Sequence, residues 1–334
     1  MSPESAPTTL ALLWFGLLGL LLFIYVSLDG FDLGVGILSL FTRKEERRGL
    51  MMASLGLMWH PNQTWLVVLG GMLFGAFPPA YAVVLSAFYL PMILLLLGFI
   101  LRGVSFEFQA AVRYHSLWRL AFGGGSLLAA LAQGFLLGGL LSGPRVVEGQ
   151  FAGSVWDWLN PFAALVAAGL VCGYALLGGA YLVLKTEGEL RAQSRGQARA
   201  AAWLVAAAAL AVAVAAGLRH PELTRKWLGP PLAFLVVPPL TLGGVLLSLR
   251  KGREYAPFLW TLGFFAAAFV CLGASLYPCL IPPGVTIAAA AAPDHLLTVM
   301  LVGLVVLLPV MLAYNAYQYW VFWGKVKEGA YPGD

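Results

Sequence analysis

Two aspartates occur inside the first long apolar run of the sequence, in the segment SLDGFDLGVG. Asp29 and Asp32 are three residues apart, so both carboxylates lie on one face of a helix. The following apolar segment carries His60 in MWHPNQTW, and histidine titrates near neutral pH. Ionisable residues within a membrane helix are costly and usually face a cavity, a partner or an ion path. These residue types favour proton transfer.

The spacing of these residues predicts that they meet at one level. Asp29 and Asp32 precede Arg43 by 14 and 11 residues, and His60 follows Arg48 by 12. At ~1.5 Å per helical residue, all three lie roughly 15–21 Å from the basic end of a helical hairpin. We therefore expect two carboxylates and an imidazole to face each other from antiparallel neighbouring helices.

A further acid extends this level toward the basic end. Glu107 follows Arg102 in LRGVSFEFQ, beside the expected mouth of the third span. The order Glu107, Asp29, Asp32 and His60 forms a candidate proton path from the entrance to the middle of the membrane. Pro61 frees a helix carbonyl for water or a side chain and favours a hydrated site at His60.

A structural interpretation competes with this one. The two aspartates can bond to Asn62, Gln63, Thr64 or a tryptophan nitrogen and lock the hairpin. Glu107 can be a solvated charge that pairs with Arg102. The candidates for such hairpin and interface roles are Trp59, Asn62, Gln63, Trp65 and Arg102.

The elements that must position these residues are membrane-spanning helices. Hydrophobic residues make up 60% of the chain and charged residues 10%, against about 25% charged in a soluble domain. The charge-free runs are as long as the ~20 residues that a helix needs to cross the hydrocarbon core, and the short alternating segments of a β-barrel are absent from the sequence. We predict an all-α polytopic membrane protein with one transmembrane domain over residues 1–334. Its nine spans are expected at about 9–41, 50–76, 79–101, 117–142, 160–184, 200–218, 228–249, 257–277 and 296–323.

The basic residues predict the orientation of these spans. With nine spans, sixteen lysines and arginines fall on one side and four on the other, out of 20 in the sequence. Positive charge gathers on the cytoplasmic side, so the N-terminus is expected outside and the C-terminus in the cytoplasm. This pattern accounts for the net charge of +5 without nucleic acid.

Residues that could ligate a metal or heme are scattered. His115, His220 and His295 fall at span ends or in loops, with no second ligand at helical spacing, and the three cysteines lie in or beside apolar runs. We expect no catalytic, cofactor-binding or metal-ligating residue in this chain.

Several segments resemble subunit II of the cytochrome bd-type quinol oxidases, in order and with similar spacing from about residue 12 to 327. The specific ones are DGFDLGVGIL in the first span and WHPNQTWLVVLGGMLFGAFPPAYA across the second. Further matches are LRGVSFEFQ, WLNPFAALVAAGL, LKTEGELR, LYPCLIPP and the weaker YNAYQYWVFWGKV. In this family the residue after the tryptophan of the second motif is commonly acidic and belongs to a proposed proton route. This chain has His60 there.

The resemblance implies a heterodimer in the prokaryotic plasma membrane. Subunit I would carry the quinol site and all the hemes, of types b and d. Subunit II would be heme-free and would fold as two four-helix bundles plus one helix. It would scaffold subunit I and line part of a proton path. The complex would oxidise quinol, reduce oxygen to water and contribute to the proton motive force. The resemblance leaves open small accessory subunits and a structural quinone beside this chain.

Two other functions remain open from the residues alone. A secondary transporter also combines buried acids with helices broken by glycine and proline. A membrane anchor for a different redox complex would show the same apolar helices. Against transport, the intramembrane polar residues gather in one hairpin and are almost missing from the second half of the chain.

Overall fold

The long apolar runs form long helices because a backbone in lipid must satisfy its hydrogen bonds within the segment. The computed structural model describes residues 6–56, 58–111, 115–219, 227, 233–321 and 324–326. Its helices are α1 (Thr9–Leu40), α2 (Glu45–Ala53), α3 (Trp59–Ala76), α4 (Pro78–Ala111), α5 (His115–Ser142), α6 (Pro161–Lys185), α7 (Gly188–Arg219), α9 (Ala233–Arg250), α10 (Ala256–Leu276), α11 (Ile287–Ala290) and α12 (Asp294–Val321). Two short antiparallel hairpins join them, β1 (Val146–Val147) with β2 (Gln150–Phe151) and β3 (Cys279–Ile281) with β4 (Val285–Thr286).

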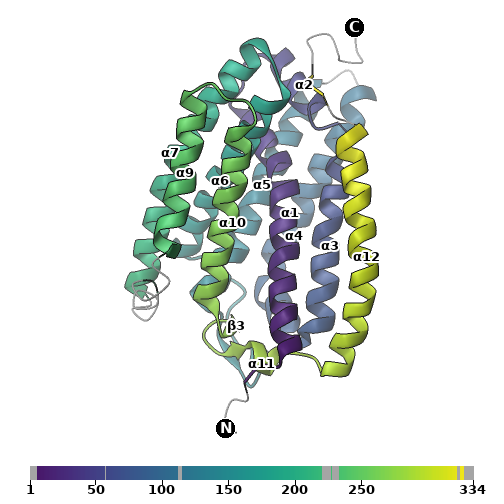
Figure 1. Cartoon of the computed structure of the whole chain (residues 1–334), viewed down its shortest axis with the longest axis vertical. Coiled ribbons are helices and arrows are strands. Elements are labelled where there is room, and N and C mark those ends of the chain that lie inside the picture. The colour runs from purple at the N-terminus through teal and green to yellow at the C-terminus, as the bar shows by residue number, and fades with distance from the viewer. Residues whose placement is uncertain are drawn as a thin grey trace.

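The all-α membrane class is confirmed. Seven of the described helices are long and apolar enough to cross a membrane: α1, α4, α5, α6, α7, α10 and α12. Helix α3 begins with a polar turn, and the apolar part of α9 is shorter, over Val236–Arg250. Both run alongside the seven in Figure 1. The count of nine crossings stays a prediction.

The span expected at 50–76 is divided, which corrects the sequence prediction. Helix α2 ends at Ala53, and α3 begins only at Trp59. Gly56 lies between them with φ +53°, a left-handed conformation that interrupts a helix. Pro61 then sits in the first turn of α3, where its missing N–H leaves no helical hydrogen bond unmade.

Two other spans extend further than expected. Helix α4 continues to Ala111 instead of ending near residue 101, and α7 begins at Gly188 instead of residue 200. Each added stretch is polar, so hydropathy alone placed the end of α4 too early and the start of α7 too late. The other described boundaries agree within a few residues, while 228–232 and 322–323 of the expected spans lie outside the described residues.

The helices pack in two groups with one helix added. Helices α1, α3, α4 and α5 contact each other in a ring, and α6, α7, α9 and α10 form a second ring. Helix α12 packs against α3 and α1 at the edge of the first group (Figure 1). This agrees with the two four-helix bundles plus one helix that the family resemblance implied.

The two groups meet where α1 crosses α6 with backbones in contact. A Cβ atom added to Gly34 would lie 1.8 Å from the carbonyl oxygen of Tyr174, and one added to Gly178 would lie 2.4 Å from the carbonyl carbon of Gly34. Only glycine fits at both positions. This contact holds the buried half of α1, which carries both aspartates, against the second group.

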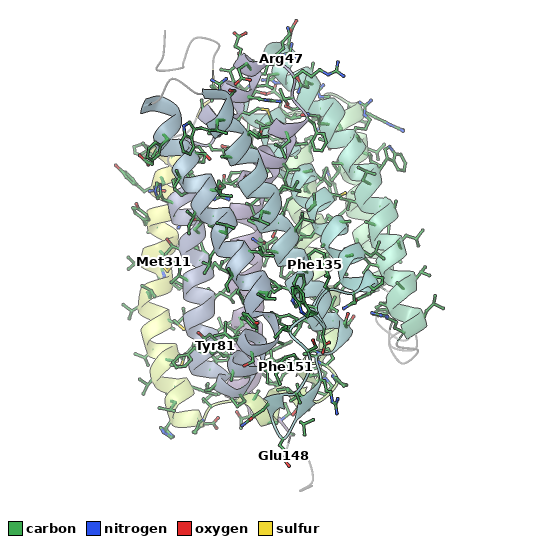
Figure 2. The ribbon with its side chains drawn as sticks, turned by 180° about the vertical axis from the view of Figure 1, so that it is seen from behind. Arg47, Tyr81, Phe135, Glu148, Phe151 and Met311 are labelled. Carbon is green, nitrogen blue, oxygen red and sulfur yellow. The ribbon has the colours of Figure 1, made fainter. Side chains whose placement is uncertain are left out.

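One end of the bundle gathers ion pairs. Arg47 and Lys44 pair with Glu189, and Lys325 lies 2.7 Å from Glu254. The hydrogen bond from Lys325 lowers the pKa of the Glu254 carboxyl. Figure 2 shows Arg47 at this end and Glu148 at the opposite end.

Candidate functional site

A fully buried ion pair lies at the centre of the first helix group. Arg102 Nη2 on α4 is 2.5 Å from Asp29 Oδ1 on α1, and neither side chain is exposed to solvent. The hydroxyl of Tyr25, one turn earlier on α1, donates to the other oxygen of Asp29 at 3.1 Å. The Arg102 guanidinium also lies 5.7 Å from the centre of the Phe99 ring.

Arg102 is therefore not the surface charge that the sequence indicated. The expected partner of Arg102 was Glu107, but Arg102 pairs with Asp29, and Glu107 is exposed on α4. The reason is the length of α4, because a helix that continues to Ala111 carries Arg102 well inside the bundle. An absence of proline or glycine clusters just after Leu101 was the signal for this continuation.

The second aspartate joins α1 to the start of α3. Asn62 Nδ2 donates to Asp32 Oδ2 at 2.8 Å and to the Leu28 carbonyl at 3.2 Å. The hydroxyl of Tyr319 on α12 donates to Asn62 Oδ1 at 3.2 Å. The bond between Asp32 and Asn62 is one that the structural interpretation expected, and it puts the first turn of α3 at the level of the aspartates.

A chain of neutral polar groups leads from Asp29 to the second helix group. Gln133 Nε2 on α5 donates to the hydroxyl of Tyr25 at 2.7 Å, and the hydroxyl of Tyr174 on α6 donates to Gln133 Oε1 at 2.5 Å. Sequence reasoning missed Gln133, although a lone amide inside an apolar run was a usable signal. It also missed Tyr25, four residues before Asp29, and had no comparable signal for Tyr174 or Tyr319.

Some polar atoms of this cluster have no protein partner within the described part of the chain. They are Asp32 Oδ1 and the Nε and Nη1 atoms of Arg102, all of them buried. Buried groups of this kind are normally satisfied by ordered water when side chains do not reach them. The cluster therefore combines two carboxylates and a guanidinium with unused hydrogen-bonding capacity.

His60 lies on the outer surface of α3, away from this buried cluster. Its side chain is exposed, and its ring packs 3.5 Å from the ring of Trp59. The Trp59 ring in turn stacks on Phe106 of α4 at 5.2 Å, next to the exposed Glu107. The structure thus brings the aspartates together with Asn62 and Arg102, and places His60 and Glu107 on an outer face of two neighbouring helices.

The remaining hairpin candidates are largely buried. Trp65 is fully buried and Trp59 is 7% exposed, and neither indole N–H has an acceptor among the described residues. Gln63 is half-buried, and its Nε2 atom also has no acceptor among the described residues. No three His, Cys, Asp or Glu side chains in the described ranges are grouped to hold a metal ion.

Comparison with known proteins identifies the family of this chain. The model of the family "Cytochrome bd terminal oxidase subunit II" matches residues 10–322 of the 334. The chain belongs to this family. It is 29% identical to the cytochrome bd-I ubiquinol oxidase subunit 2 of Escherichia coli K12 over 367 residues, covering 96% of each chain. It is 30% identical to the cytochrome bd ubiquinol oxidase subunit 2 of Bacillus subtilis, covering 95% of this chain and 96% of that one.

The fold agrees with a solved structure of the same kind. The structure of bd oxidase from Geobacillus thermodenitrificans matches with a TM-score of 0.79 at 19% identity, over 95% of this chain and 99% of that chain. Membership of the family makes this chain subunit II of a quinol oxidase, a membrane oxidoreductase in which it accompanies a subunit I. The predicted identity as a quinol oxidase subunit is confirmed, which excludes the transporter and the anchor of another redox complex. Hemes belong to the complex.

Proposed function

We propose that the outer face of α3 docks onto subunit I, which holds the hemes and the quinol site. The support is a stripe of exposed residues at helical spacing, formed by His60, Thr64, Val67, Gly71 and Phe74. An imidazole and a hydroxyl on a membrane helix are poorly matched to lipid, so this face needs protein or water against it. Subunit I is the partner that the family supplies.

The polar groups behind this face supply a proton route toward the oxygen-reducing site. Glu107 and His60 form its rim on α4 and α3, and Asp32 and Asp29 form its inner part. Support comes from Asn62, which follows His60 by two residues and bonds Asp32. Asp32 Oδ1 and the Nε and Nη1 atoms of Arg102, which have no partner among the described residues, give water a place to bind between the carboxylates. Besides lining the route, Asp29 binds Arg102 and so positions that charge.

The orientation of the chain in the membrane determines the side from which the route takes up protons. Arg102 is excluded from the comparison because it lies in a fully buried ion pair, which leaves fifteen lysines and arginines on one side and four on the other. The bias still favours a cytoplasmic location for the end with α2 and the ion pairs. We accordingly propose the prokaryotic plasma membrane, with the N-terminus outside, the C-terminus in the cytoplasm, and proton uptake from the cytoplasm.

His60→Leu is the experiment that tests this function. It removes the titrating group and keeps the apolar bulk, so oxygen uptake driven by quinol should fall about 10²-fold if proton transfer becomes limiting. Uptake is measured from pH 6 to 9 and normalised to heme content, so that assembly is scored separately. His60→Asp restores the residue common in the family and should retain activity.

Asp32→Asn tests the inner part without breaking the ion pair, because Asp29 keeps Arg102 and the amide oxygen can still accept from Asn62. The matched control is Thr64→Val, one turn along the same stripe. Full assembly with the parental rate at every pH in both His60→Leu and Asp32→Asn would show that this level is structural.

The heme assignment has its own test. Replacing His115, His220 or His295 with alanine should leave the absorption bands of every heme in place, because subunit I supplies the ligands. His295 is exposed in the first turn of α12, whereas the His115 side chain and His220 lie outside the described residues. Loss of one band in a well-assembled variant would identify a ligand in this chain.

A further inference from the structure

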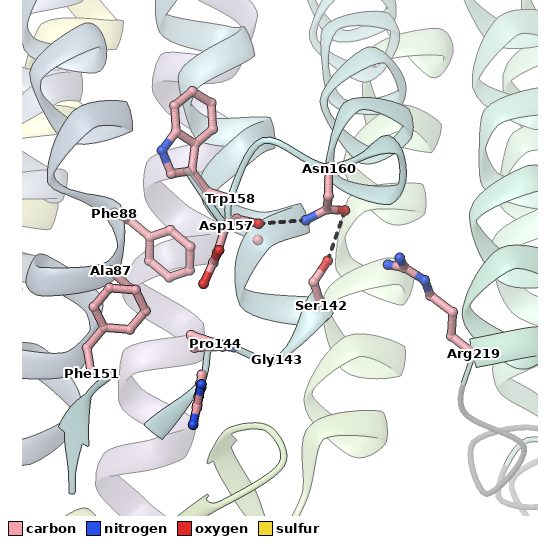
Figure 3. A pocket seen from close by; sticks show the side chains of 12 residues that line it. Ala87, Phe88, Ser142, Gly143, Pro144, Phe151, Asp157, Trp158, Asn160 and Arg219 are labelled. Atoms are coloured by element: carbon pink, nitrogen blue, oxygen red, sulfur yellow. Dashed lines mark hydrogen bonds between the residues drawn. The ribbon is translucent and has the colours of Figure 1, made fainter. Parts of the chain in front are cut away.

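A pocket of about 460 Å³ with both charged and aromatic lining opens at the end of the bundle opposite the ion-pair cluster. It lies between the end of α5, the start of α6, the end of α7, and the β1–β2 hairpin. Figure 3 shows Ser142, Asn160 and Asp157 around it, with the Arg219 side chain reaching in from α7. Phe88, Phe151 and Trp158 form its apolar wall.

The charges of this pocket favour an anion. Arg145 and Arg219 bring two cations and Asp157 one carboxylate, which leaves one net positive charge. Within the described part of the chain, no ion pair joins either arginine to a carboxylate. Arg219 instead lies 5.1 Å over the Phe162 ring. Asp157 accepts a hydrogen bond from the Ser154 amide at 2.8 Å.

An apolar cavity of about 680 Å³ adjoins this pocket. The two share Phe88, and Gly139 of the pocket precedes Leu140 of the cavity. On α6 the cavity lining runs from Val166 to Tyr174, eight residues or about 12 Å. On α4 the lining is longer, from Tyr81 to Leu96, fifteen residues or about 22 Å, so the cavity begins in the leaflet beside the pocket and extends past the middle of the ~30 Å hydrocarbon core.

We propose that the pocket and cavity together bind one phospholipid of this leaflet. Its phosphate lies between Arg145 and Arg219, and an acyl chain fills the cavity as far as Tyr174. Arginine binds phosphate through paired, charge-assisted hydrogen bonds, and the cavity wall offers the chain almost only apolar side chains. If the ligand were inorganic phosphate, the cavity would stay empty. If it were a lipid with an uncharged head group, neither arginine would gain a counterion from it.

Native mass spectrometry of the intact, detergent-washed oxidase tests this site. The probes are phosphatidylglycerol and inorganic phosphate, each added to delipidated complex. Arg145→Gln with Arg219→Gln should lower occupancy by one phosphatidylglycerol about tenfold, the effect of losing a charge-assisted hydrogen bond. Ala268→Phe fills the cavity and should lower the phosphatidylglycerol occupancy by a similar factor, although both arginines are intact. Arg250→Gln, an exposed arginine at the other end, is the control and should not change it.

Three results would overturn the proposal. Undiminished phosphatidylglycerol in the double arginine variant would exclude the head site. Loss in that variant but not in Ala268→Phe, together with equal binding of inorganic phosphate, would leave a phosphate site without a lipid. A retained mass that matches a quinone, displaced by Ala268→Phe, would assign the cavity to that molecule. Loss in both variants with the control unchanged supports the phospholipid.

Discussion

Removing one charge of the buried Asp29–Arg102 pair should damage the oxidase much more than removing both. Both side chains are fully buried, so Arg102→Met leaves a carboxylate without its counterion, and Asp29→Asn does the same to the guanidinium. Breaking such a pair costs about 3–5 kcal/mol, whereas replacing both charges with neutral groups is often close to neutral. We expect little assembled complex from either single variant and clear recovery in the double variant.

Assembled complex per cell, and its thermal midpoint followed by fluorescence-detected size exclusion, measure this effect. Arg250→Met removes an exposed arginine and serves as the control for loss of charge alone. A double variant no more stable than the worse single variant would show that the charges act separately. The same assay should separate Asp32→Asn from the Asp29→Asn and Arg102→Met variants. Asp32→Asn should assemble because it leaves the Asp29–Arg102 pair intact.

Gly34→Ala should separate the two helix groups. The added methyl would lie 1.8 Å from the carbonyl oxygen of Tyr174 and 2.8 Å from the amide nitrogen of Gly178, and backbone cannot move aside as a flexible side chain can. Overpacking commonly costs about 1–3 kcal/mol, and a backbone clash belongs at or above the upper end. We expect loss of assembly or a midpoint lowered by about 5 °C or more.

Gly16→Ala and Gly19→Ala are matched controls on the same helix, because nothing lies within 4 Å of a Cβ at either position. Gly178→Ala tests the contact from the other side and should reproduce the damage. A Gly34→Ala protein with the midpoint of Gly16→Ala would mean that α1 and α6 do not cross this closely in the membrane.

The sequence by itself determined the membrane class, most helix ends and the family. Charge-free runs exceed the length of the hydrocarbon core, and no soluble fold buries so many of them, so composition decides the class. The prolines at 78 and 79 separate α3 from α4 because proline starts a helix well and continues one poorly. The paired aspartates and the motif around His60 indicated the polar level of the first hairpin.

Only the tertiary structure decided which partners these residues have. Whether Arg102 faces water or Asp29 depends on where α4 ends, and that end lies in a polar stretch that hydropathy does not resolve. Whether His60 faces inward or outward depends on the rotation of α3, which the break at Gly56 resets. Gln133 gains its role from tyrosines on α1 and α6, more than 40 residues away on either side. Helix rotation and crossing follow from packing between distant segments, so no local pattern contains them.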